Sequence, residues 1–321
     1  VIGGVKELEK RAGKLPENLH KPWIDGVEFN CPKCKAVMKR VPDVLDVWID
    51  AGTLSWNILD YPKEKKLFGE LYPADFILEA KEQIRGWFNM LMVTSFITFN
   101  KPSFKACYMH GMLTDVEGVK MSKSLGNVIS PYEIVDKYGA DVLRYYMCQT
   151  TAGEDIKFSW EDVKLKHRNL VVLWNLHKFL IDYSRSSGVK LKSYNTIKKN
   201  LTEVEKYILS RKESTIKQVT ELYENYRLDE TIAPIEELFL DLSRTYIQLI
   251  REKSVFGNDK EKEVVLYTLS EVLLKVITLF STICPFITES IYQNLKQEFG
   301  FKEESIHYLI WPKVDTKQIN K

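Results

Sequence analysis

The pattern of apolar residues changes its period near residue 161, and this change constrains the fold more than any other feature of the chain. Up to that point, short β-rich runs alternate with helical patterns. Beyond it, apolar residues recur at three- and four-residue steps, with few strand signals. We therefore predict an α/β domain followed by an all-α domain. The length of 321 residues agrees, because domains of about 150 residues each would give two.

The composition is that of an ordinary soluble protein. Hydrophobic residues make up 45% and charged residues 28% of the chain, with a net charge of +2, which excludes a disordered chain and a disulfide scaffold. Five cysteines, an odd and small number, favour a reducing compartment, which we take to be the cytoplasm. Val1 is not an initiator methionine and no signal or transit segment follows it, so we expect a piece of a longer protein.

One apolar run, from Val264 to Ile287, has nearly the length of a membrane span. Glu271 and Lys275 interrupt it, lie four residues apart and are expected to pair on one helix face, and Pro285 ends it. Because charges are costly in the middle of a bilayer, we predict a buried bundle helix and no membrane contact, with a membrane span as the alternative.

A strand, helix and strand follow one another in the first half. The apolar run 74–78 predicts a strand, residues 81–99 a helix and residues 104–109 a second strand. Such a crossover unit implies a parallel sheet that binds ligands at the carboxyl ends of its strands. Those ends carry Glu79 and the pair His110 and Gly111.

The second half contains long amphipathic helices, of which residues 203–226 form one example. Its recurring aromatic and aliphatic positions are expected to be bundle core. Residues 161–200 hold nine Lys or Arg against three Asp or Glu. This basic surplus either faces phosphate groups or is simply a solvated face.

The most specific string is GVKMSKSLGN at residues 118–127, which lies between the second strand and a helix that Pro131 opens. Lys120 and Lys123 stand in a glycine-flanked loop with hydroxyl groups between them, a mobile cationic arm suited to phosphate oxygens. The alternative is a basic surface turn.

This KMSKS string resembles the signature loop of class I aminoacyl-tRNA synthetases. Three further blocks are similar to consecutive blocks of the isoleucyl members, in order and in spacing: DVLDVWIDAG at 43–52, FILEAKEQIRGWF at 76–88 and YMHG at 108–111. Residues 136–144 and 167–175 are similar to the family's linker and to the start of its anticodon-binding bundle. The likeness covers essentially the whole chain.

The resemblance implies three parts. Residues 1–40 would be a zinc-associated insertion remnant, residues 41–160 the second half of a Rossmann-like catalytic fold, and residues 161–321 a helical anticodon-binding domain. The family's HIGH motif does not occur in the sequence, and there is no room for an editing domain. We therefore expect a portion of the enzyme that is poorly active alone.

The implied reaction activates isoleucine with ATP and Mg²⁺ and transfers it to tRNA(Ile), in a monomeric enzyme. The alternatives are a portion of a valyl or leucyl enzyme, or a non-catalytic tRNA-binding module. Catalysis would need cations that stabilise the departing pyrophosphate rather than a protein nucleophile. By the resemblance, the catalytic residues would be Lys123 and Lys120. The ATP-binding residues would be His110, Gly111, Val119, Met121, Ser122 and Lys123.

A second set of residues matches positions that contact the adenylate and the amino acid in isoleucyl enzymes: Glu79, Glu82, Gln83, Trp48 and Trp87. The two tryptophans are expected to wall a pocket for a branched aliphatic side chain, with an ordinary core position as the alternative. The family often has Gly, Ser, Asp and His where this chain has Ala80, Lys81, Glu82 and Ile84, and the lost glycine restricts how closely the backbone approaches a ligand.

Cys31 and Cys34 have the spacing of a zinc knuckle, but a structural Zn²⁺ ion takes four ligands. The other cysteines are scattered, so this is half a site. The family pattern places another such pair upstream. The alternative is a turn that happens to contain two thiols.

Overall fold

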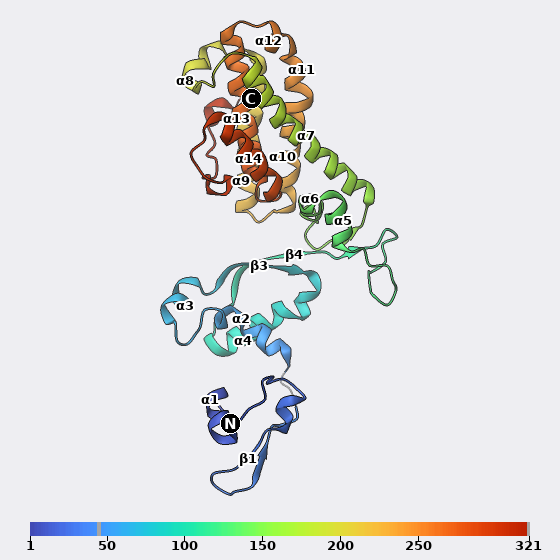
Figure 1. Ribbon diagram of the computed structural model, residues 1–321, viewed down its shortest axis with the longest axis vertical. Helices are drawn as coiled ribbons and strands as arrows, with labels where there is room; N and C mark the ends of the chain where they lie inside the picture. Colours follow the sequence, from blue (N-terminus) through green and yellow to red (C-terminus); the bar gives the residue numbers. More distant parts are fainter. Residues whose placement is uncertain (44–45, 320–321) are drawn as a thin grey trace. The chain divides into compact units, whose positions relative to one another are not determined.

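The computed structural model describes residues 1–43 and 46–319. Val44 and Leu45 of the first similar block, and the last two residues of the expected third part, lie outside the described residues. The chain divides into two compact units, whose elements are labelled in Figure 1. Unit 1 comprises residues 1–76 and 82–106, and unit 2 comprises residues 77–81 and 107–321.

Unit 1 is built from short elements. They are α1 (Val5–Ala12), the 3-10 turn η1 (Trp23–Gly26), β1 (Glu28–Asn30), β2 (Val37–Lys39), α2 (Val47–Asn57), α3 (Lys65–Leu71) and α4 (Trp87–Phe99). Strands β1 and β2 form an antiparallel hairpin in which Phe29 is paired with Met38.

Helices α2 and α4 pack closely against each other. The carboxylate of Asp46 accepts a hydrogen bond from the backbone N–H of Trp48 at 2.9 Å and so caps the start of α2. Gly52 lets α4 approach, because a Cβ atom there would lie 3.0 Å from the carbonyl oxygen of Met90. The hydroxyl of Thr94 then donates to the Gly52 carbonyl at 2.6 Å. A small residue at one position thus fixes the packing of the helix pair.

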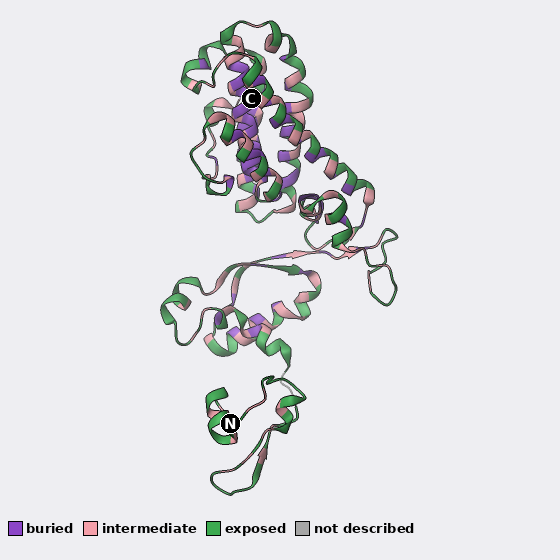
Figure 2. Cartoon of the chain, in the orientation of Figure 1, coloured by how far each residue is buried: buried purple, intermediate pink, exposed green. Residues whose placement is uncertain are grey.

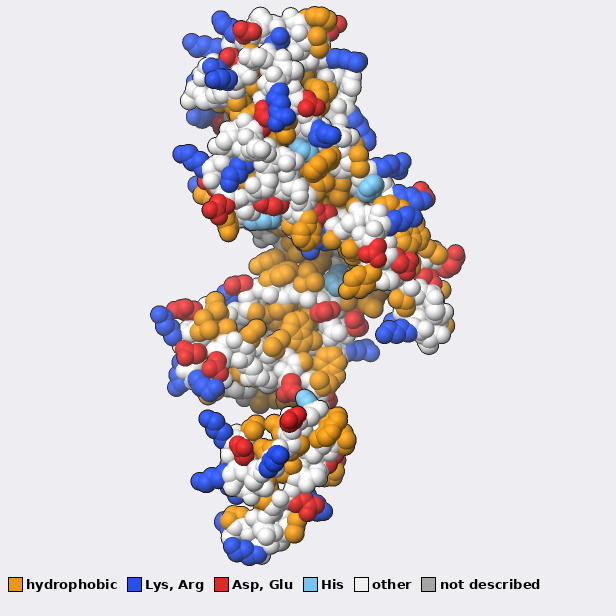
Figure 3. All heavy atoms as spheres, viewed as in Figure 1, with side chains coloured by type: hydrophobic (Ala, Val, Ile, Leu, Met, Phe, Trp, Pro, Cys, Tyr) orange, Lys and Arg blue, Asp and Glu red, His pale blue; other side chains and the backbone are white. Residues whose placement is uncertain are grey.

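Helix α4 is apolar on all its sides, and part of that surface is exposed. Val93, Phe96 and Ile97 are 42%, 47% and 80% exposed, and Leu54 on α2 is 44% exposed. Hydrophobic side chains gather over the region of these two helices in Figure 3. An exposed apolar surface of this kind is typical of a face that packs against another partner or chain segment.

The predicted strand, helix and strand are confirmed with shifted boundaries. They are β3 (Ala74–Ala80), the 3-10 turn η2 (Lys81–Arg85), α4 and β4 (Phe104–His110). β3 and β4 are neighbours in one sheet, and the division between the units runs through both strands. The expected single helix is in two parts because Gly86 leaves helical geometry, so that α4 begins only at Trp87.

Unit 2 adds a two-stranded parallel sheet and a helical bundle. Its smaller elements are β5 (Leu113–Thr114), β6 (Ile156–Lys157), α5 (Pro131–Tyr138) and α6 (Ala140–Met147), with Leu113 paired to Ile156. The bundle consists of α7 (Trp160–Ser186), α8 (Tyr194–Ile197), η3 (Lys198–Asn200), α9 (Glu203–Glu224), η4 (Asp229–Thr231), α10 (Ile232–Asp241), a π-helical segment (Leu242–Tyr246), α11 (Ile247–Leu249), α12 (Arg251–Phe256), α13 (Asp259–Phe280), α14 (Pro285–Phe299), η6 (Ile306–Tyr308) and η7 (Thr316–Gln318).

The core of unit 2 is one continuous cluster, and Figure 2 shows its buried residues inside the bundle. The apolar run of the sequence is α13, whose Val264, Val272 and Phe280 are fully buried. No helix in the described parts of the chain is long and apolar enough to cross a membrane. The prediction of a buried bundle helix is therefore confirmed.

The predicted pairing of Glu271 with Lys275 is wrong. Glu271 accepts instead from the ammonium group of Lys212 on α9, at 2.9 Å. Lys212 is only 2% exposed, and a buried cation needs carboxylates around it. The carboxylate of Glu271 thus pairs with a buried cation across the helix interface and not with the lysine on its own helix face.

Candidate active site

The KMSKS loop follows β5 and is organised by the carboxylate of Asp115. This carboxylate accepts hydrogen bonds from the backbone N–H groups of Glu117 at 3.0 Å and Val119 at 2.7 Å, and from the side-chain amide of Asn127 at 2.8 Å. The Asn127 amide and these backbone groups lower the pKa of Asp115. A lowered pKa means that the charged form holds the loop at neutral pH, and that this hold is lost only as the pH falls through the folded-state pKa.

Asn127 closes the loop from its other end. Its side-chain oxygen accepts from the backbone N–H of Ser122 at 2.9 Å, and its amide nitrogen also lies 3.3 Å from the carbonyl oxygen of Lys120. The sequence predicts a cationic arm, and the structure shows what ties both ends of that arm. The glycine at 118 has φ +85°, and a Cβ there would lie 2.8 Å from the Lys157 side chain.

Both lysines of the loop are exposed. Within the described chain, neither Lys120 nor Lys123 forms an ion pair with a carboxylate. Their ammonium groups are therefore available to an anion that approaches from solvent. Ser122 lies between the two lysines and Ser124 follows Lys123, and their hydroxyl oxygens are 3.1 Å apart. The side chain of Val119 is exposed and that of Met121 is half-buried.

The end of β4 is held by residues 152–155. Gly111 is buried, and a Cβ atom there would lie 1.6 Å from the carbonyl oxygen of Glu154. Glycine is thus required for chain packing, in addition to the nucleotide contact that the sequence predicts. The Nδ1 atom of His110 lies 2.7 Å from the Gly111 carbonyl oxygen. Since a carbonyl only accepts, Nδ1 is the donor in this contact.

Asp155 joins the ends of both strands. It accepts from the backbone N–H of Met112 at 2.7 Å and forms an ion pair with Lys81 at 2.7 Å. Lys81, with these hydrogen bonds, lowers the pKa of Asp155. Lys81 is one of the departures from the family pattern, and this contact gives it a structural role. Glu79, nearby in the sequence, is exposed, and its carboxylate accepts from the N–H of Ala80 at 3.0 Å.

The remaining predicted adenylate residues belong to unit 1, where three of them lie together. The side-chain oxygen of Gln83 accepts from the backbone N–H of Trp87 at 2.8 Å and caps α4. The indole N–H of Trp87 donates to the Ala51 carbonyl at 3.0 Å. Gly86 lies against both Gln83 and Trp48, since a Cβ atom there would lie 2.5 Å from the Gln83 side-chain oxygen and 3.4 Å from the Trp48 ring. Trp48 is 39% exposed and can form a wall, whereas Glu82 is exposed.

Cys31 and Cys34 lie at the tip of the β1–β2 hairpin. The turn is closed by hydrogen bonds from the N–H of Cys31 to the Ala36 carbonyl at 2.8 Å and from the N–H of Lys35 to the Cys31 carbonyl at 2.9 Å. The backbone N–H groups of Cys34 and Lys33 lower the pKa of Cys31, which favours the thiolate that binds metals. No cluster of three or more potential metal ligands occurs in residues 1–43 and 46–319. Two thiols are fewer than the four ligands that a structural Zn²⁺ ion takes.

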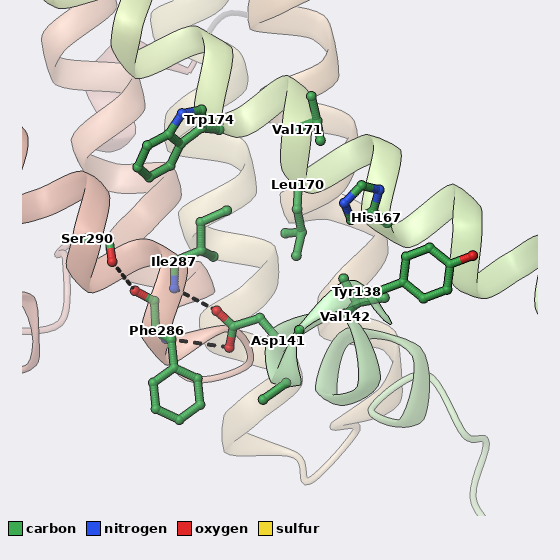
Figure 4. Close-up of a pocket in the computed structure, with 12 residues that line it drawn as sticks. Tyr138, Asp141, Val142, His167, Leu170, Val171, Trp174, Phe286, Ile287 and Ser290 are labelled. Carbon is green, nitrogen blue, oxygen red and sulfur yellow. Dashed lines mark hydrogen bonds between the residues drawn. The ribbon is translucent and has the colours of Figure 1, made fainter. Parts of the chain in front are cut away.

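Several contacts in unit 2 have no signal in the sequence. A cavity of about 660 Å³ lies between α6, α7 and α14, and its lining includes Trp174 and Phe286 (Figure 4). Beside it, the carboxylate of Asp141 accepts from the N–H of Ile287 at 2.6 Å and caps α14. The Tyr108 hydroxyl donates to Asp229 at 2.8 Å. These partners are more than 100 residues apart, so no local pattern points to them.

Two known families match consecutive segments of the chain, in the same order as the motifs of the sequence. Residues 5–159 match the model of class I tRNA synthetases (I, L, M and V). Residues 205–321 match the anticodon-binding domain of tRNA ligases. The chain thus carries a class I tRNA synthetase region followed by an anticodon-binding domain.

The similar curated proteins are isoleucine-tRNA ligases. Those of Methanothrix thermoacetophila, Methanopyrus kandleri and Thermococcus kodakarensis are 39%, 38% and 40% identical over 97%, 100% and 99% of this chain. The chain spans only 30%, 32% and 30% of their lengths.

Two solved structures share the fold. One is the LeuRS of Agrobacterium radiobacter K84, in a ternary complex with tRNA and LeuAMS, with a TM-score of 0.69 at 23% identity. The match covers 93% of this chain and 37% of the LeuRS chain. The methionyl-tRNA synthetase of Mycobacterium tuberculosis, in complex with methionyl-adenylate, has a TM-score of 0.66 at 18% identity. This match covers 87% of this chain and 55% of the methionyl-tRNA synthetase chain.

Proposed function

We propose that this chain forms the KMSKS-bearing part of the catalytic domain and the tRNA-binding domain of an isoleucine-tRNA ligase. The observation that carries the proposal is the KMSKS loop, in which Asp115 and Asn127 tie the backbone while both lysines remain exposed. The loop follows the strand end at His110 and Gly111 in a chain about 39% identical to such ligases. We propose the same three parts that the resemblance implies: an insertion remnant at residues 1–40, the second half of the catalytic fold at 41–160 and the anticodon-binding domain at 161–321.

The proposed reaction has two steps. The carboxylate of isoleucine attacks the α-phosphate of ATP, an acyl–phosphate bond forms, and pyrophosphate leaves. A ribose hydroxyl of the tRNA then takes the acyl group and AMP leaves. The first step places growing negative charge on pyrophosphate, and the free ammonium groups of Lys120 and Lys123 are suited to stabilise it. Mg²⁺ would enter with the phosphates of ATP and help to neutralise them.

The other predicted residues receive supporting roles in this proposal. His110 offers its Nε2 atom, and Val119, Met121 and Ser122 offer loop backbone and hydroxyl groups to the nucleotide. The rings of Trp48 and Trp87 provide apolar surface for the isoleucine side chain, and Glu79, Glu82 and Gln83 provide polar groups for the adenylate. The oxygen of Gln83 already caps α4, so its amide N–H groups are the ones left to bind a ligand.

Part of the basic surplus in residues 161–200 is used within the chain. Four of its nine cations form ion pairs: Lys164 with Glu161, Lys166 with Glu236, Arg185 with Glu298, and Lys192 with Glu263. Exposed cations such as Arg168 and Lys178 are the ones that we propose to contact tRNA phosphates. Both the tRNA(Ile) partner and a monomeric, cytoplasmic enzyme belong to this proposal.

The test of the proposal is amino-acid-dependent exchange of pyrophosphate into ATP, measured with the full-length product of the gene that encodes this chain. Isoleucine is expected to support exchange with the highest kcat/KM, ahead of valine and leucine. A preference for valine or leucine would instead assign the chain to a valyl- or leucyl-tRNA synthetase. Absence of exchange with all three, together with retained tRNA binding, would favour a non-catalytic tRNA-binding module instead.

Asn127→Ala is expected to lower kcat/KM for ATP in this exchange about tenfold, because the loop loses the side-chain hydrogen bonds of Asn127 to Asp115, Ser122 and Lys120, worth about 0.5 kcal/mol each. The matched control is Asn195→Ala, at an exposed asparagine outside the loop, which should leave kcat/KM unchanged. Equal kcat/KM values for the wild type and Asn127→Ala would contradict the role given to the loop.

We also propose that Cys31 and Cys34 are two ligands of a structural Zn²⁺ ion whose other ligands are outside the described residues. The full-length product is expected to hold zinc after dialysis, and Cys31→Ser or Cys34→Ser to lose it, because a structural site that lacks one of its four ligands binds the ion weakly. Cys107→Ser is the control and should retain zinc. Equal zinc content in all four proteins, measured by atomic emission, would remove the proposal.

A further inference from the structure

The strand that ends at the candidate nucleotide site also makes a buried contact with the helical bundle. Tyr108 lies on β4 two residues before His110, so the two side chains extend from the same face of the strand. Tyr108 is 8% exposed, and its hydroxyl donates to the carboxylate of Asp229 at 2.8 Å, with the carbonyl oxygen of Thr150 at 3.2 Å as a second acceptor. Asp229 begins the turn η4 between α9 and α10.

The Tyr108 hydroxyl remains a donor over the whole physiological range. Burial and the neighbouring Asp229 carboxylate raise the pKa of Tyr108 well above its usual value. A phenol that donates to a carboxylate makes a charge-assisted hydrogen bond, which is stronger than one between neutral groups. The Asp229 turn is itself braced by the ion pair between Arg227 and Glu230, which flank it.

One side of this part of the strand borders a cavity rather than packed side chains. A cavity of about 380 Å³ lies beside it and is lined by Leu78, Tyr108 and His110 from the strands and by Cys148, Tyr223 and Asp229 from the helical part. A densely packed interior allows little side-chain displacement, whereas a strand beside a cavity is held by its few polar contacts. On its other edge, the end of β4 is held by backbone contacts such as the hydrogen bond from the N–H of Gly153 to the Met109 carbonyl at 2.8 Å.

We propose that Tyr108 and Asp229 form a positioning pair that couples the tRNA-binding bundle to the nucleotide site by holding the strand end at His110 and Gly111. Neither residue touches the substrate. The pair sets where the strand end lies during isoleucine activation, and it does so from a turn of the bundle that is 121 residues away in sequence. This inference rests on the proposed function for its effect on catalysis, but not for its effect on the strand.

The variants are Tyr108→Phe, Asp229→Ala and Asp229→Asn, made singly and in the pair Tyr108→Phe with Asp229→Ala, in the full-length gene product. Tyr108→Phe and Asp229→Ala are each expected to lower kcat for isoleucine-dependent exchange about tenfold with a smaller change in KM for isoleucine. The double variant should be no worse than either single one, because the two residues act through one contact. Asp229→Asn keeps an acceptor and should recover most of the activity.

The matched control is Tyr292→Phe. Tyr292 is buried in α14 and its hydroxyl donates to the Glu303 backbone carbonyl at 3.0 Å, so Tyr292→Phe removes a buried tyrosine hydrogen bond far along the chain from the strand end. It should lower the urea midpoint without changing kcat. If Tyr108→Phe behaves in the same way, or if the losses of the two single variants multiply in the double variant, the positioning pair is overturned.

Hydrogen–deuterium exchange keeps the test independent of activity. Asp229→Ala is expected to speed exchange of the backbone amides in residues 104–112, although the substitution is in the bundle. Unchanged protection of that peptide overturns the inference. If the wild type shows no isoleucine-dependent pyrophosphate exchange, the proposed function is refuted. If Asp229→Ala still loses amide protection in residues 104–112, the link between strand and bundle is supported all the same.

Discussion

Replacing Lys123 with alanine is expected to lower kcat for isoleucine-dependent pyrophosphate exchange about 10²–10³-fold in the full-length gene product, with a much smaller effect on KM for isoleucine. Lys123 is exposed in a loop whose backbone is fixed by Asp115 and Asn127, so the ammonium group can be placed without a partner in the free protein. In the proposed reaction, its charge acts on the developing pyrophosphate and not on the amino acid, which is why kcat is expected to be the sensitive quantity.

The matched control for this prediction is Lys302→Ala, at an exposed lysine that follows α14 in unit 2. It should leave kcat unchanged within about twofold. Lys123→Arg is the more informative companion, because it keeps the charge and changes the shape of the cation. A Lys123→Ala enzyme that retains more than a tenth of the wild-type kcat would show that the transition state is stabilised elsewhere.

Replacing Lys212 with alanine is expected to reduce the free energy of unfolding by about 3–5 kcal/mol, the usual cost of breaking a buried ion pair. The ammonium group of Lys212 lies 2.8 Å from Glu213 and 2.9 Å from Glu271, and the lysine is 2% exposed. Its removal leaves the carboxylates of Glu213 and Glu271 without their shared cation between α9 and α13. Urea unfolding of this chain, followed by circular dichroism, measures the loss.

Lys217→Ala provides the control on the same helix, because Lys217 is exposed and its ammonium group is 3.9 Å from Glu221. Its loss should cost less than about 0.5 kcal/mol. A cost below about 1 kcal/mol for Lys212→Ala would mean that the site relaxes or admits water.

The pH dependence of this contribution follows from the charges around Lys212. Burial by itself lowers the pKa of Lys212, but Glu271 and Glu213 outweigh burial, so the pKa is raised. A lysine with a raised folded-state pKa contributes its full stabilisation below its unfolded pKa and loses it as the pH rises through the folded-state value. The difference between the wild type and Lys212→Ala should therefore stay constant through neutral pH and shrink only in strongly alkaline solution.

The sequence by itself determined the local features of this protein. The change of period near residue 161 predicted two classes of structure, the 74–109 region predicted a strand, a helix and a strand, Pro131 predicted a helix start, and Pro285 predicted the end of the apolar run. These features depend on neighbours within a few residues. The KMSKS string and the CxxC pair are equally local, so their residues were predicted before any fold was known.

Only the tertiary structure decided which distant groups meet. Periodicity predicted that α13 is buried but not that Glu271 would leave Lys275 for Lys212, because a buried cation attracts the carboxylate across a helix interface more strongly than an i, i+4 neighbour does. In the same way, Gly111 is required because the backbone of Glu154 passes against it, and Tyr108 finds Asp229 only when the strand and the bundle pack together. The spacing of residues along the sequence does not reveal such pairs, because the two partners are buried together only once the chain has folded.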